Sequence, residues 1–189
     1  MFKLLMLAAG AALTFLVAAG GGANKPAHAQ VLEFQEATPG STVVVDRVLD
    51  GDTVILRGSS QRIRLASIDA PEMSHGYGRP GQPYSVQASK WLTQQLEGKP
   101  GVTMKCVDED RYGRRVCNFY RNGENVNKAA VRAGIAWANT TSNARYLRDK
   151  TVLTAQEEAR AARRGIWAEP SPTAPWHWRK ECWEKHVCG

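Results

Sequence analysis

Beyond residue 29 the chain has no long apolar run, which excludes an internal membrane-spanning helix. Its four cysteines and four histidines do not stand at any common zinc-binding spacing, which argues against a zinc module. The excess of positive over negative charge is also small, with 25 basic against 18 acidic side chains. That balance suits a polyanionic partner but does not identify one.

The N-terminus has the pattern of an export signal. Lys3 gives a short basic start, an apolar core follows, and Ala27-His28-Ala29 is a small-x-small cleavage signature. We therefore expect a signal peptide over residues 1–29, cleaved after Ala29, and a periplasmic or secreted protein with no stable membrane association afterwards. A retained anchor is the alternative, and the glycines within the apolar run disfavour it. Without Lys3 and Lys25 the net charge falls from +7 to +5.

Export makes disulfides the expected state of the cysteines. Cys106 and Cys117 flank a candidate hairpin, and Cys182 and Cys188 would close a small loop in the tail. Metal binding in the tail is the alternative, and its ligands would be His177, Cys182, His186 and Cys188.

Hydrophobic patterns and turn residues predict one domain at residues 42–168, after a lead-in at residues 30–41. Five strands are expected near 42–49, 52–57, 61–68, 101–107 and 114–120, and three helices near 84–96, 125–134 and 144–165. The third strand changes phase between Leu65 and Ile68, which predicts a bend there. Residues 169–189 are rich in proline and tryptophan and predict an extended C-terminal strap pinned to the body by Trp176, Trp178 and Trp183.

Charged side chains gather in three separate segments. "DGDT" contributes Asp50 and Asp52, "RLASIDAPE" contributes Arg64, Asp69 and Glu72, and "DRYGRR" contributes Asp110, Arg111, Tyr112, Arg114 and Arg115. Carboxylates from separate places suit Ca²⁺ or Mg²⁺, and arginines match the oxygens of a phosphate. A carboxylate free of the metal can orient a water as general base. The set indicates phosphodiester hydrolysis.

Each segment also has a plain structural interpretation. Asp50 with Gly51 is a common hairpin turn, and Asp52 can be a solvated strand start. Asp69 and Glu72 can cap backbone amides, and "DRYGR" can be a charged hairpin tip with Tyr112 packed beneath it. The occurrence of all three in one span favours the functional interpretation.

Together "VLDGDTVIL", "RIRLASIDAPE" and "DRYGRRVC", with the later "NVNKAAVRAGIAW" and "GIW", resemble the thermonuclease family of staphylococcal nuclease-like domains. This chain looks like an exported bacterial type with extra cysteines. The resemblance covers about residues 42–168. It implies an α+β fold, an OB-type five-stranded barrel with three helices, and Ca²⁺-dependent hydrolysis of DNA and RNA in which water attacks phosphorus and the 5′-oxygen leaves.

The resemblance also implies the roles of individual residues. Asp52, Asp69 and the backbone carbonyl of Ala70 would hold the metal, with Asp50 as a further candidate beside it. Glu72 would be the general base, and Arg64 and Arg114 would bind the scissile phosphate and stabilise its charge. Tyr112 is a candidate substrate contact.

Two departures from the family stand out. Position 70 is alanine where threonine is familiar, which a carbonyl ligand tolerates, and "NTTSN" replaces the tyrosines that face the nucleotide in the best-known member. Nucleic acid is the expected partner of a protein that acts as a monomer. The alternatives are a barrel that binds nucleic acid or protein without cutting it, and a phosphoesterase for small nucleotides.

Overall fold

The structure, a computed structural model, describes residues 41–188. The expected signal peptide and nearly all of the expected lead-in lie outside these residues. The strands are β1 (Val45–Val48), β2 (Thr53–Leu56), β3 (Arg62–Leu65), β4 (Ile68–Asp69), β5 (Val102–Glu109), β6 (Arg115–Arg121), β7 (Glu124–Asn125) and β8 (Trp137–Ala138). The α-helices are α1 (Ser85–Leu96), α2 (Val126–Arg132), α3 (Thr141–Ala144), α4 (Thr151–Ala161) and α5 (Pro175–Trp178).

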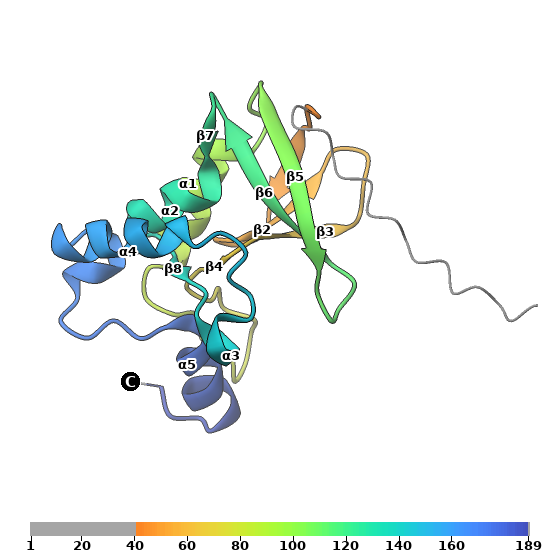
Figure 1. Ribbon diagram of the computed structural model, residues 1–189. Helices are drawn as coiled ribbons and strands as arrows, with labels where there is room; N and C mark the ends of the chain where they lie inside the picture. The colour runs from red at the N-terminus through yellow and green to blue at the C-terminus, as the bar shows by residue number, and fades with distance from the viewer. Residues whose placement is uncertain (1–40, 189) are drawn as a thin grey trace, which may run out of the picture. The chain divides into compact units, whose positions relative to one another are not determined.

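The five expected strands form one sheet in the order β1-β2-β3-β6-β5, with β7 paired to β6. All neighbouring pairs are antiparallel except β3 and β6, which run parallel. Figure 1 shows this sheet on one side of the body and α1, α2 and α4 on the other. The buried side chains between them include Val54, Leu65, Leu92, Phe119 and Val131, which make one apolar core.

The two ends of the strand order meet. Thr42, just before β1, bridges to Thr103 of β5, and the Val43 amide donates to the Val102 carbonyl at 2.8 Å. This contact brings the first and last strands together, as a barrel requires. The expected α+β fold class is confirmed, and the additional strands β4, β7 and β8 are only two residues long each.

The predicted bend after β3 is confirmed. Ser67 has a left-handed backbone, with φ of 66°, and it separates β3 from β4. Its hydroxyl accepts hydrogen bonds from the amides of Arg148 and Asp149 at 2.9 and 2.8 Å. The chain thus leaves the main sheet, and β4 pairs with β8 so that Asp69 lies opposite Trp137.

Asn127, the second residue of α2, holds the backbone beside this bend. Its side-chain amide donates to the carbonyls of Ala66 and Cys117 at 3.1 and 3.0 Å, and its oxygen accepts from the Phe119 amide at 3.1 Å. The side chain is fully buried. Buried backbone groups need such partners, so one asparagine joins β3, β6 and α2.

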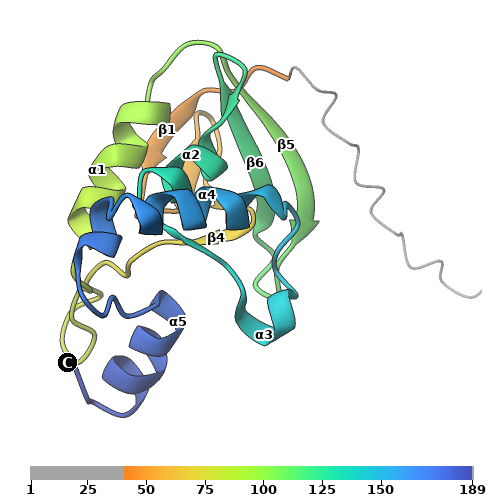
Figure 2. The ribbon, with the colours of Figure 1, turned by 60° about the vertical axis from the view of Figure 1, so that its left-hand side comes forward.

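The helices differ from the expected ones in detail. In α1, Ala88, Leu92 and Leu96 are fully buried, whereas Val86 is 48% exposed. The last long helix begins at Thr151 rather than near residue 144, because residues 142–144 have positive φ and the Ser67 hydroxyl holds the backbone of residues 148 and 149 outside the helix. Figure 2 shows this irregular segment, with α3, leading into α4.

Both expected disulfides are present. Cys106 and Cys117 face each other across β5 and β6, and Cys182 joins Cys188. Because both tail cysteines are in a disulfide, they cannot act as thiolate ligands, and the alternative of a zinc site in the tail is wrong.

The C-terminal strap, defined here as residues 169–188, was expected to be extended, but part of it is helical. Residues 175–184 are helical, with α5 followed by a π-helical turn. Pro175 suits the first position of α5, where no N–H partner is needed. The indole groups of Trp178 and Trp183 both donate to the Pro80 carbonyl, at 3.3 and 3.0 Å. Within residues 41–188, no helix has the length and apolar character needed to cross a membrane.

Candidate active site

The turn between β1 and β2 places Asp52 against residue 70. Asp52 is only 2% exposed, and its Oδ2 accepts a hydrogen bond from the Ala70 amide at 2.7 Å. Gly51 makes this approach possible, since a Cβ there would lie 2.5 Å from the Cβ of Ala70 and 2.8 Å from that of Ala88. Asp50 stays in the turn, where its Oδ1 accepts from the Asp52 amide at 2.9 Å.

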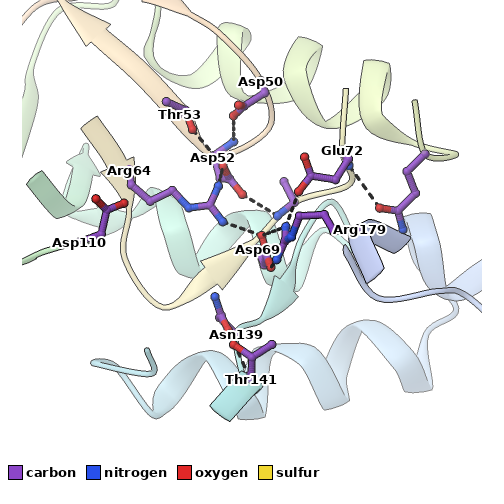
Figure 3. Close-up of polar contacts among 12 residues, drawn as sticks. Asp50, Asp52, Thr53, Arg64, Asp69, Glu72, Asp110, Asn139, Thr141 and Arg179 are labelled. Atoms are coloured by element: carbon purple, nitrogen blue, oxygen red, sulfur yellow. Dashed lines mark hydrogen bonds and ion pairs between the residues drawn. The ribbon is translucent and has the colours of Figure 1, made fainter. Parts of the chain in front are cut away.

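Arg64 joins the two carboxylates that were predicted as metal ligands. One end of its guanidinium bonds to Asp52 Oδ1, and the other donates to Asp69 Oδ1 at 2.5 Å. Arg64 comes from β3 and Asp69 from β4, so the bend at Ser67 turns both side chains toward one place (Figure 3). The plain interpretation of Asp52 as a solvated strand start is wrong, because its carboxylate is buried and paired.

Asp69 is fully buried, yet it is held in its charged form. Burial alone would raise its pKa, but the guanidiniums of Arg64 and Arg179 outweigh burial and hold the pKa below its ordinary value. A buried carboxylate with two arginine partners therefore lies at the centre of the cluster.

Glu72 lies beside Asp69 but has a different environment. Its side chain is 17% exposed and bonds to Arg179. Burial raises its pKa above the ordinary value, although the charge of Arg179 opposes this. Its backbone is held by Gln82. The Gln82 Oε1 accepts from the Glu72 backbone amide at 3.2 Å, and the Gln82 backbone amide donates to the Glu72 carbonyl at 2.8 Å.

The hairpin tip between β5 and β6 holds the remaining predicted residues. Asp110 Oδ1 accepts from the amides of Tyr112 and Arg114, and the Arg114 Nε donates to Asp110 Oδ2 at 2.6 Å. Tyr112 is 68% exposed, so the alternative in which it packs beneath the tip is wrong. Its ring lies under the guanidiniums of Arg111 and Arg114, at 4.8 and 5.6 Å.

Arg114 does not bond to the buried carboxylates. Its positive charge nevertheless acts on Asp50, whose pKa is raised by burial and lowered in part by Arg64 and Arg114. The structure thus brings Asp52, Arg64, Asp69 and Glu72 into one cluster and leaves Arg114 and Tyr112 on a hairpin that faces the solvent.

Sequence reasoning missed two contributors, Arg179 and Gln82. Arg179 donates to Asp69 Oδ2 at 2.8 Å and also bonds to Glu72 (Figure 3). The only sequence signal for it was a basic residue in a tail with anchoring tryptophans. Gln82 is buried within the loop that follows Glu72.

The donor set fits a hard divalent cation. Among the described residues no three His, Cys, Asp or Glu side chains gather as a metal-binding group, so a site here would rest on two carboxylates and backbone oxygen. Asp52 and Asp69 share one guanidinium, and Asp52 is bonded to the backbone of Ala70. Two carboxylates and the Ala70 carbonyl are the oxygen ligands that Ca²⁺ prefers.

Several known proteins have sequences similar to this chain. The staphylococcal nuclease homologue family matches residues 62–169. An uncharacterized endonuclease of Escherichia coli O157:H7 is 42% identical over 138 residues, which cover 71% of this chain and 82% of that protein. Protein ParB of Escherichia coli is 34% identical over 187 residues, which cover 93% of this chain and 92% of that protein.

A plant relative is a longer protein, and the match covers only part of it. The staphylococcal-like nuclease CAN1 of Arabidopsis thaliana is 37% identical over 119 residues, covering 63% of this chain but only 33% of that protein. The family match includes Arg64, Asp69, Glu72 and Arg114, and the sheet and bend described above place the first three together. The chain belongs to the staphylococcal nuclease family.

Proposed function

We propose that the protein is a Ca²⁺-dependent nuclease that hydrolyses phosphodiester bonds of DNA and RNA. Family membership and the endonuclease names of the relatives support a nuclease. The observation that carries the proposal is the arrangement of Asp52, Asp69 and Glu72 around Arg64 and Arg179. Two carboxylates for a metal, Arg64 for a phosphate and Glu72 for a water meet in one place.

Glu72 is the proposed general base. Its carboxylate is separate from the Asp52–Arg64–Asp69 group and partly open to solvent, so a water can reach it. Glu72 would take a proton from the water as the water oxygen bonds to phosphorus. As the bond from phosphorus to the 5′-oxygen breaks, the 5′-oxygen takes a proton from the solvent and leaves as a 5′-hydroxyl, while the other product keeps a 3′-phosphate.

Arg64 and Arg114 are the proposed phosphate ligands. Two of the five N–H donors of Arg64 bond to Asp52 and Asp69, which orients the guanidinium while its other donors remain available to a phosphate oxygen. Arg114 stands on the exposed hairpin and would meet the substrate from another side. Tyr112 next to it offers an exposed ring to a base or sugar.

Asp52, Asp69 and the Ala70 carbonyl would hold Ca²⁺, and Asp50 stays a weaker candidate because its carboxylate caps the Asp52 amide. A bound Ca²⁺ would supply positive charge against the negative charge that develops on the phosphoryl oxygens. The buried ion pairs fix the two carboxylates before any ligand arrives.

A plasmid-nicking assay tests the function. Purified protein should convert supercoiled plasmid to nicked and linear forms with Ca²⁺, EDTA should abolish the conversion, and added Ca²⁺ should restore it. A labelled RNA in the same buffer should also be cut. Full activity in EDTA would contradict the metal assignment.

The same assay separates the alternatives. A module that binds without cutting would shift the plasmid on a gel but leave it supercoiled. A phosphoesterase for small nucleotides would release product from a nitrophenyl nucleotide ester and leave the plasmid intact. Either result would replace the proposed function.

We also propose that the protein works outside the cytoplasm, as a monomer. The two disulfides support export, because such bonds persist in oxidising compartments. The mass of the protein recovered from a periplasmic or culture fraction should match a chain that begins at Gln30. Recovery of the uncleaved chain from membranes would contradict this.

A further inference from the structure

The strap brings a basic side chain to the catalytic carboxylates from outside the region that matches the family. The match ends at residue 169, and Arg179 lies ten residues further on, directly after α5. The family model therefore does not extend to this arginine.

Arg179 spans two carboxylates that have different proposed tasks. Its guanidinium donates to both oxygens of Asp69, at 3.3 and 2.8 Å, and bonds to Oε1 of Glu72. Asp69 is fully buried and Glu72 is 17% exposed, while Arg179 itself is 35% exposed. In Figure 3 Arg64 approaches Asp69 from one side and Arg179 from the other.

The strap that carries Arg179 is docked at several points on the loop that follows Glu72. The indoles of Trp178 and Trp183 donate to the Pro80 carbonyl, and the Gln82 side chain donates to the Thr173 carbonyl at 2.5 Å. Gln82 also binds the backbone of Glu72, so one residue links the strap to the loop of the proposed base. These contacts fix Arg179 on both sides of its position in the sequence.

A glutamate side chain has several rotamers, and holding one of them has an entropic cost. The planar guanidinium can bind two carboxylates at once in a defined geometry. Arg179 thereby sets the position of Glu72 relative to Asp69, a function that the core domain does not provide with its own arginine, because Arg64 bonds to Asp52 and Asp69 but not to Glu72.

We propose that Arg179 is a positioning residue of the active site, which holds the side chain of the general base Glu72 at a fixed position beside that of Asp69. This inference rests on the proposed nuclease function. It makes the disulfide-closed strap a part of the catalytic centre rather than a packing appendage.

Three variants test the inference. Arg179→Ala removes the contact, Arg179→Lys keeps the charge but not the two-pronged geometry, and Lys180→Ala is the matched control, since it removes an exposed charge from the adjacent position. We expect Arg179→Ala to lower kcat by about 10- to 100-fold with KM changed less than about threefold, in line with the loss of groups that orient a site. Arg179→Lys should recover part of kcat, and Lys180→Ala should match the wild type.

Calcium affinity, measured by titration calorimetry, gives a readout besides activity. Arg179→Ala removes a positive charge beside Asp69, so Ca²⁺ should bind at least as tightly as to the wild type. A merely structural role would instead weaken Ca²⁺ binding along with kcat. Weakened binding, an unchanged kcat, or a kcat that rises would each overturn the inference, and a rise would show that Arg179 obstructs the site. If Arg179→Ala does not fold, Arg179→Lys decides, and a kcat equal to that of the wild type overturns the inference.

The inference and the proposed function can fail separately. If the wild type cuts no nucleic acid with Ca²⁺, the proposed function fails. Thermal unfolding of Arg179→Ala, Glu72→Gln and the double variant then still measures whether the two side chains are coupled. Shifts in Tm that add up in the double variant would show that the side chains of Arg179 and Glu72 do not interact, and would overturn the inference.

Discussion

The buried cluster of Asp52, Arg64 and Asp69 and the exposed hairpin tip of Asp110, Tyr112 and Arg114 contain similar side chains in opposite environments. In the cluster, both carboxylates are almost completely shielded from solvent and share a guanidinium. At the tip, Arg114 is 30% exposed and pairs with its own neighbour in the turn. The cluster depends on the fold and supports it, whereas the tip can serve a substrate without serving the fold.

This difference predicts that variants in the two regions will separate stability from activity. A buried carboxylate left without its arginine is strongly destabilising, but an exposed ion pair contributes little to the free energy of unfolding. The predictions below follow from that contrast.

Glu72→Gln should give the largest loss of activity, on the order of 10² or more in kcat, because an amide cannot take the proton from water. The fold should remain, since Gln82 holds the backbone of residue 72. Initial rates on a labelled single strand measure the effect, and Glu109→Gln at the exposed end of β5 is the control. Near-normal cleavage by Glu72→Gln would contradict the assignment of Glu72 as general base.

Arg64→Ala should lose both activity and stability. It leaves Asp52 and Asp69 buried without their shared partner, which costs about 3 kcal/mol in the free energy of unfolding. For a protein of this size Tm should fall by about 10 °C. Calorimetry without substrate measures this, and an unchanged Tm would mean that the two ion pairs do not stabilise the fold.

Arg114→Ala should lose activity but keep its stability. We expect kcat to fall on the order of 10², as for removal of a charge-stabilising group. The change in the free energy of unfolding should stay below about 1 kcal/mol, because the pair with Asp110 is local and partly exposed. If Arg114→Ala unfolds as readily as Arg64→Ala, the contrast between the two regions is wrong.

The strands, the bend and the acids of the site could be predicted from the sequence, because they depend on local patterns. Alternating Ile63 and Leu65 fix which face of β3 is buried, and the phase change at Ile68 marks the bend that Ser67 makes. Both disulfides could be predicted from cysteine spacing and the expected export. The grouping of Asp52, Asp69 and Glu72 came from family motifs as much as from chemistry.

Other features could not be predicted because they depend on long-range contacts. Asn127 satisfies backbone groups of Ala66, just after β3, and of Cys117 in β6, and no local pattern marks an asparagine in a helix as an anchor. Arg179 meets Asp69 across 110 positions of sequence, through a strap whose prolines and tryptophans predicted an extended chain. The late start of α4 has the same origin, since Ser67 holds residues 148 and 149 from a distant part of the chain.

The pH dependence should show the smallest effect. Burial raises the pKa of Glu72, and the base must be deprotonated to act. The rate should therefore decline on acidification at a pH above the ordinary pKa of a glutamate. A profile of kcat/KM checks this, with circular dichroism to confirm that the fold persists, and an acid limb at or below the ordinary value would contradict it.

The ends of the cleaved strand test the central claim most directly. If Glu72 activates water against a phosphate held by Arg64, and the 5′-oxygen leaves, every Ca²⁺-dependent cut in a labelled single strand should yield a 3′-phosphate and a 5′-hydroxyl. Phosphatase treatment followed by gel analysis identifies the ends. Products with 3′-hydroxyl ends, or no cleavage that depends on Ca²⁺, would contradict the account.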